Sequence, residues 1–141
     1  MGRIGLGPPP GAYPLLHRDA TVEFGLFVSR LLPKRAVLAL SGDLGAGKTT
    51  FVQGLAKGLG IDGPIQSPTF ILLNLYPGLA HFDLYRLKGE NDFIGLGFEE
   101  YFSSDLICAL EWPDRIATLL PKESIHIHFE YRNEGRIAHV K

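Results

Sequence analysis

The sequence predicts a three-layer α/β domain with a mixed parallel and antiparallel sheet. Two patterns support this fold class. In the first half, a short apolar run alternates with segments of helical periodicity, and in the second half, pairs of β-rich segments are separated by turn residues. The chain has 141 residues, 45% of them hydrophobic, which is the usual size of one domain with its own core. We expect a single domain over residues 16–141.

The first fourteen residues hold four glycines and four prolines. Because proline lacks a backbone N–H, this composition does not favour a helix or a ladder of strand hydrogen bonds. We expect residues 1–15 to form a flexible Gly/Pro-rich arm without strand pairing.

A helix is predicted over residues 21–32, where apolar side chains recur mostly at helical spacing. Asp19 or Thr21 is the expected N-cap, and Pro33 follows the end. The continuous apolar run 36–40 then predicts a strand that is covered on both faces.

A second helix should begin near Lys48 and end at Gly58 or Gly60, because glycine readily adopts the left-handed conformation after a helix. Two β-rich segments, 69–76 and 79–85, follow and are separated by Pro77-Gly78. They predict an antiparallel hairpin.

The last third of the chain predicts one more buried strand and a closing hairpin. A polar stretch with Asn91 and Asp92 precedes these elements. In order we expect a short helical segment over 98–102, a buried strand over 106–110, a helical turn or two over 114–120, and a hairpin of 124–131 with 136–140.

Charge and cysteine content exclude several classes of protein. Fourteen basic and fifteen acidic residues give a net charge of −1, so the chain lacks the excess positive charge of an autonomous nucleic-acid binder. The single cysteine, Cys108, can form neither an intrachain disulfide nor a cysteine metal cage. No apolar run approaches membrane-spanning length and no secretory signal opens the chain, so we expect a cytoplasmic protein without membrane contact.

A phosphate-binding motif, a P-loop, lies between the first predicted strand and the second helix. Glycines let successive N–H groups point at phosphate oxygens, the helix adds its positive dipole end, the lysine neutralises the β- and γ-phosphates, and the threonine hydroxyl ligates Mg²⁺. The predicted ATP-binding residues are Gly42, Asp43, Leu44, Gly45, Ala46, Gly47, Lys48, Thr49 and the following Thr50, which match G-x-x-x-x-G-K-[ST].

A P-loop needs an acidic partner for the metal from a neighbouring strand. Glu111 ends the apolar strand run, and Asp83 ends another strand after the predicted hairpin turn. Thr69, in Ser67-Pro68-Thr69, can supply a hydroxyl that senses the γ-phosphate through Mg²⁺, as a switch threonine does in GTPases.

Four motifs together resemble the TsaE family, also called YjeE, the small bacterial ATPases of tRNA threonylcarbamoyladenosine synthesis. The resemblance covers about residues 17–141. The motifs are Gly42-Asp43-Leu44-Gly45-Ala46-Gly47-Lys48-Thr49-Thr50, Ser67-Pro68-Thr69-Phe70, His81-Phe82-Asp83-Leu84-Tyr85-Arg86-Leu87 and Glu111-Trp112-Pro113. The short turn at Pro77-Gly78 and the Gly/Pro arm depart from the family pattern.

The resemblance implies an α/β P-loop domain that hydrolyses ATP with Mg²⁺ and supports the partners TsaD and TsaB in modifying adenosine 37 of tRNA. The chain would contact tRNA only indirectly, through the complex. By the same resemblance, Lys48, Asp83 and Glu111 are catalytic, and Thr49, Thr69, Asp83 and Glu111 organise the metal and the attacking water. Trp112 would stack near the adenine.

Three other functions remain open on the P-loop alone. A nucleotide or small-molecule kinase uses the same loop, but the chain has little room for an arginine-bearing lid. A GTPase is possible, although no Asn-Lys-x-Asp string follows. A non-catalytic nucleotide-binding regulator would need no second carboxylate.

Further polar residues invite functional interpretation. His126 and His128 face the same side of a predicted strand and can either clasp a metal or line an exposed face. Arg86 and Arg115, near the motif carboxylates, can act as a charge-stabilising finger or form structural salt bridges.

Overall fold

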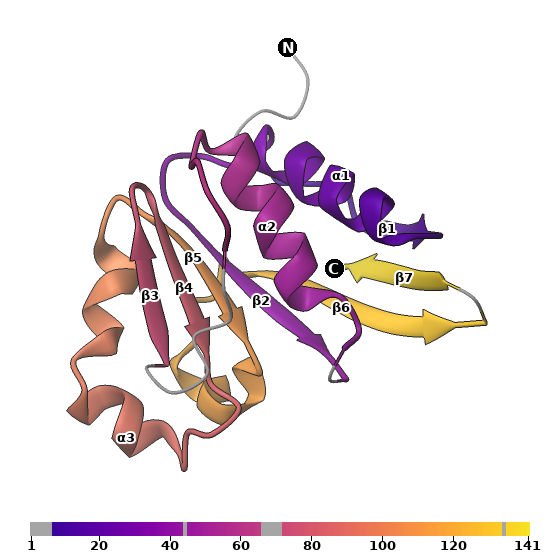
Figure 1. Cartoon of the computed structure of the whole chain (residues 1–141). Helices are drawn as coiled ribbons and strands as arrows, with labels where there is room; N and C mark the ends of the chain where they lie inside the picture. Colours follow the sequence, from indigo (N-terminus) through magenta and orange to yellow (C-terminus); the bar gives the residue numbers. More distant parts are fainter. Residues whose placement is uncertain (1–6, 44, 66–71, 134) are drawn as a thin grey trace.

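The computed structural model describes residues 7–43, 45–65, 72–133 and 135–141. Within these residues the chain forms a seven-stranded sheet with helices on its faces (Figure 1). In chain order the elements are β1 (Gly11–Leu15), α1 (Arg18–Ser29), β2 (Ala36–Gly42), α2 (Lys48–Gly58), β3 (Leu73–Tyr76), β4 (Leu79–Asp83), α3 (Glu90–Gly95), the 3₁₀-helix η1 (Phe98–Ser103), β5 (Ile107–Glu111), the 3₁₀-helix η2 (Pro113–Leu119), β6 (Ile125–Arg132) and β7 (Gly135–Val140). Among the helices described, none is long and apolar enough to cross a membrane.

The strand order is β1-β7-β6-β2-β5-β4-β3. The central strands β6, β2, β5 and β4 run parallel, whereas the outer pairs β1–β7, β6–β7 and β3–β4 are antiparallel. Parallel strands end at the same edge of a sheet, so the carboxyl ends of β2, β5 and β4 meet there. This mixed sheet confirms the predicted fold class.

Two hydrophobic cores lie on opposite faces of the sheet, because side chains alternate along each strand. Helices α1 and α2 cover one face (Figure 1). On this face, Phe51 of α2 packs against Phe129 of β6. On the other face, Phe82 of β4 packs against Phe93 of α3 and Phe98 of η1. The face under α2 is also the face that carries the polar side chains at the carboxyl ends of β4 and β5.

The prediction that residues 1–15 lack strand pairing is wrong for residues 11–15. β1 pairs antiparallel with β7, with Gly11 opposite Val140 and Leu15 opposite Arg136. Pro14 fits because β1 is an edge strand, where one side of the backbone makes no ladder bonds. Composition alone did not reveal this strand, since its pairing partner lies at the other end of the chain.

Two helix predictions also need correction. α1 begins at Arg18, before the expected start, because His17 is the N-cap and its Nδ1 accepts a hydrogen bond from the Ala20 N–H at 3.2 Å. Asp19 is therefore inside the helix rather than at its cap. The polar stretch that precedes η1 forms α3, which buries Phe93 and was not expected as a helix.

Candidate functional site

The predicted phosphate-binding loop connects β2 to α2 at the carboxyl edge of the sheet. Gly42 and Gly47 adopt φ angles of 133° and 108°, a conformation that side chains with a Cβ rarely take. Gly42 ends β2 opposite Phe129 of β6, and the Phe129 backbone oxygen leaves no room for a Cβ at this position. Gly47 precedes α2 without a side-chain cap, which leaves the first N–H groups of α2 available for an anion.

Lys48 begins α2 and is 4% exposed. Its Nζ donates to the Gly42 oxygen at 2.6 Å and lies 3.7 Å from the centroid of the Trp112 ring. Burial lowers the pKa of Lys48, although the nearby carboxylates of Glu111 and Asp83 oppose this shift. The ammonium group is thus held at the loop by a carbonyl and an aromatic face.

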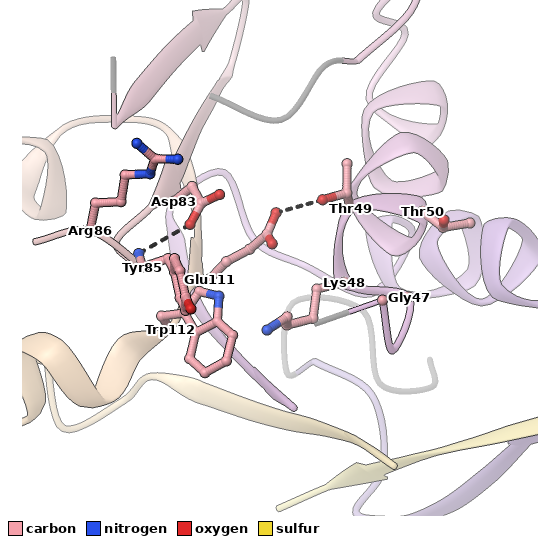
Figure 2. A pocket seen from close by; sticks show the side chains of 10 residues that line it. Gly47, Lys48, Thr49, Thr50, Asp83, Tyr85, Arg86, Glu111 and Trp112 are labelled. Atoms are coloured by element: carbon pink, nitrogen blue, oxygen red, sulfur yellow. Dashed lines mark hydrogen bonds between the residues drawn. The ribbon is translucent and has the colours of Figure 1, made fainter. Parts of the chain in front are cut away.

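The two predicted carboxylates come from neighbouring strands. Asp83 of β4 and Glu111 of β5 are register partners, and Glu111 is also opposite Leu40 of β2. Thr49 Oγ1 donates to Glu111 Oε2 at 3.0 Å, and the Tyr85 N–H donates to Asp83 Oδ1 at 3.1 Å. The structure therefore brings the P-loop hydroxyl and the strand-end carboxylate into direct contact (Figure 2).

These groups line a cavity of about 360 Å³ at the carboxyl edge of the sheet (Figure 2). Its lining residues are Gly45, Gly47, Lys48, Thr49, Thr50, Asp83, Tyr85, Arg86, Glu111 and Trp112. Of the other predicted loop residues, Ala46 is buried and Asp43 is exposed, with the Ala46 N–H donating to the Asp43 oxygen at 3.1 Å. Leu44 and Thr69 lie outside the described residues.

Trp112 leaves β5 with φ 60°, a left-handed conformation that is rare for a tryptophan. This turn places the indole against the Lys48 ammonium, with its ring centroid 5.0 Å from that of Tyr85. The ring thus lies at the Lys48 end of the cavity. Stacking of Trp112 on an adenine stays a prediction.

Nucleotide binding should change the fluorescence of Trp112, the one tryptophan of the chain. Phosphate oxygens that approach Lys48 must compete with the cation–π contact, a contact worth about 0.5–2 kcal/mol. We expect Mg-ADP and inorganic triphosphate both to shift the emission, with saturation that matches calorimetry.

The Trp112→Ala variant then separates the two roles of this side chain. Weaker binding of ADP would support base stacking if the binding of triphosphate, which no longer competes with the ring for Lys48, is unchanged or tighter. Emission that is indifferent to saturating Mg-ADP would contradict the placement of nucleotide beside this ring.

Three contacts at the site were not predicted from the sequence. His81 of β4, completely buried, places Nε2 at 2.7 Å from Glu111 Oε2. The Gly45 oxygen accepts hydrogen bonds from Tyr131 Oη at 2.6 Å and from Arg136 at 3.2 Å, so the β6–β7 hairpin holds the loop. The i, i+2 spacing of His81 and Asp83 signalled a shared face; no local signal pointed to Tyr131 or Arg136.

The remaining polar residues have different surroundings. Arg86 lines the cavity, whereas Arg115 donates to the Tyr85 backbone oxygen at 3.2 Å. His126 and His128 are exposed on β6, and His128 Nδ1 is 2.8 Å from Ser41 Oγ. Across the described ranges, no group of three or more His, Cys, Asp or Glu side chains could enclose a metal.

Comparison with known proteins agrees with this architecture. The family model described as "Threonylcarbamoyl adenosine biosynthesis protein TsaE" matches residues 15–138. Among solved structures, the crystal structure of Bacillus subtilis YdiB superposes with a TM-score of 0.80 at 30% identity, covering 94% of this chain and 84% of that one.

Curated relatives point the same way. A Treponema pallidum protein named tRNA threonylcarbamoyladenosine biosynthesis protein TsaE is 43% identical over 118 residues, which span 82% of this chain and 87% of the relative. A Haemophilus influenzae protein of the same name is 35% identical over 119 residues, spanning 81% and 75%. These matches confirm the resemblance seen in the motifs: the chain belongs to the TsaE family.

Proposed function

We propose that the protein binds ATP with Mg²⁺ in the cavity between the P-loop and β4–β5 and hydrolyses it to ADP and phosphate. The observation that carries this proposal is the 3.0 Å contact between Thr49 Oγ1 and Glu111 Oε2, beside the buried Lys48. A buried lysine, a hydroxyl and a strand-end carboxylate in this arrangement are the parts that P-loop enzymes use on MgATP. The first N–H groups of α2 would hold phosphate oxygens.

The residues present suit Mg²⁺. This ion takes hard oxygen ligands and is usually held by one or two carboxylates together with substrate phosphates. The Thr49 hydroxyl and the carboxylates of Asp83 and Glu111 supply such oxygens on the cavity wall. Bound Mg²⁺ would neutralise phosphate charge.

The protein's own groups would divide the remaining work. The Lys48 ammonium, already desolvated, would leave the Gly42 oxygen for the β- and γ-phosphates, where charge develops during transfer. Glu111 and Asp83, as register partners, present two acceptors that can orient an attacking water at the γ-phosphate. Trp112 and Tyr85, whose ring centroids lie 5.0 Å apart, form an aromatic part of the cavity wall.

We further propose that this ATPase works in tRNA threonylcarbamoyladenosine synthesis with TsaD and TsaB, and that it reaches tRNA through them. Membership of the TsaE family supports the pathway. The net charge of −1 argues against an independent tRNA-binding surface.

Binding measurements test this partnership. We expect the chain to associate with a TsaD–TsaB complex and to bind naked tRNA only weakly at about 150 mM salt. Submicromolar tRNA binding by the isolated chain would contradict indirect contact, and failure to associate with TsaD–TsaB in the presence of ATP would contradict the partnership.

A further inference from the structure

His81 lies at the centre of the β4–β5 pair, where its side chain has no solvent exposure. His81 and Asp83 lie on the same face of β4, because every second side chain of a strand points to the same face. From this position its ring crosses to β5, where Nε2 lies 2.7 Å from Glu111 Oε2. His81 therefore contacts the Glu111 carboxylate from the buried side of the site.

The direction of this hydrogen bond follows from which atoms can donate and which can accept. An ionised carboxylate only accepts, so Nε2 of His81 carries the hydrogen and donates it. Nδ1 of His81 is buried and has no hydrogen-bond partner among the described residues. In the other tautomer, Nδ1 would carry a buried N–H with no acceptor. The Nε2–H tautomer avoids this cost and places its N–H on the carboxylate.

Glu111 Oε2 thus accepts two hydrogen bonds, one from His81 and one from Thr49. Under the proposed function, these two hydrogen bonds differ in how they relate to the bound nucleotide and metal. Thr49 is the hydroxyl that would turn to the metal, and its bond to Glu111 would then change. The donor of the other bond, His81, is buried and does not line the cavity, so a bound nucleotide would not contact it directly.

We propose that His81 is a positioning residue that holds the Glu111 carboxylate at the metal and water end of the cavity through its Nε2–H. The proposal rests on the proposed function of Glu111. Glutamate has three rotatable side-chain bonds, and a fixed donor removes most of that freedom before the nucleotide binds. Residues that hydrogen-bond to a metal ligand without touching the metal typically change metal affinity or activity about 10–100-fold when they are removed.

Two substitutions distinguish positioning from mere packing. In His81→Gln the amide nitrogen lies as many bonds from Cα as Nε2 does, so a donor can still reach Glu111. In His81→Asn the amide corresponds to Nδ1 and falls short of the carboxylate. Phe93→Leu is the control for lost stability, since Phe93 is buried in the other core, away from Glu111.

The test measures ADP affinity by calorimetry, once with Mg²⁺ and once with EDTA, for each protein. The ratio of the ADP affinity in Mg²⁺ to the ADP affinity in EDTA should be the same for wild type and Phe93→Leu. His81→Asn should lower the Mg²⁺ enhancement about tenfold while leaving the affinity in EDTA within about twofold, and His81→Gln should restore most of it. The ATPase rate should follow the same order through kcat rather than KM.

An independent readout uses nitrogen-15 NMR of labelled histidine, with the His81→Gln spectrum for assignment. We expect the Nε2–H tautomer with a slowly exchanging proton; an Nδ1–H tautomer would overturn the proposal.

The calorimetric outcomes separate this proposal from the one it rests on. If Mg²⁺ does not enhance ADP binding by wild type, the proposed metal site is wrong and the role of His81 falls with it. If wild type shows the enhancement and His81→Asn shows the same enhancement and the same kcat, only the role of His81 is wrong.

Discussion

Replacing Lys48 with alanine is expected to abolish measurable ATP binding while leaving the fold intact. The Lys48 ammonium is buried at the loop, so it has already lost most of its hydration and can meet phosphates at little further desolvation cost. Burial lowers the pKa of Lys48, and the carboxylates of Glu111 and Asp83 oppose that shift and favour the charged form. Loss of about 3 kcal/mol or more from charge-assisted bonds to two phosphates corresponds to more than a hundredfold in affinity. Calorimetry with ATP measures this loss.

Lys57→Ala is the matched control, because Lys57 is exposed in the last turn of the same helix. It should bind ATP as wild type does. If Lys48→Ala bound ATP within about threefold of wild type, the P-loop assignment would be wrong. Thermal unfolding of each variant shows whether any loss reflects the fold.

Glu111→Gln is expected to separate binding from hydrolysis. The substitution keeps the size of the side chain and the acceptor oxygen for Thr49 or His81 but removes the charge that would orient water and support the metal. We expect the ATPase rate constant to fall about 10²–10⁴-fold while ADP affinity in EDTA changes less than about threefold. Asp83→Asn should show the same separation.

The control for this pair is Glu99→Gln, which removes an exposed carboxylate from η1 without touching the cavity. Proportional losses of binding and turnover would make Glu111 a structural residue. Full turnover in either variant would remove that carboxylate from the catalytic site.

Local sequence was sufficient for the parts of the site that depend on backbone conformation and strand ends. The glycines at 42 and 47 encode the left-handed turns of the loop, and the apolar run that ends at Glu111 encodes a strand whose carboxyl end carries an acid. Because parallel strands end at one edge, Asp83 and Glu111 could be expected together before their register was known.

Contacts between distant segments were beyond local sequence. β1 forms only because β7, more than a hundred residues away, offers an edge to pair with. The hydrogen bond from Tyr131 to Gly45 depends on how the β6–β7 hairpin lies over the loop. Trp112 lies beside Lys48 because Trp112 itself adopts a left-handed backbone conformation. The sequence gives no sign of this turn, since the position is not a glycine.

Phosphate release from ATP by the purified protein, measured with Mg²⁺ and with TsaD, TsaB and tRNA present, is the most direct test of ATP hydrolysis at this cavity. Glu111→Gln in the same mixture controls for contaminating ATPases. We expect Mg²⁺-dependent turnover by wild type that falls at least about a hundredfold in the variant. Turnover that is equal in both proteins, or ATP bound without any phosphate release, would contradict hydrolysis at this cavity.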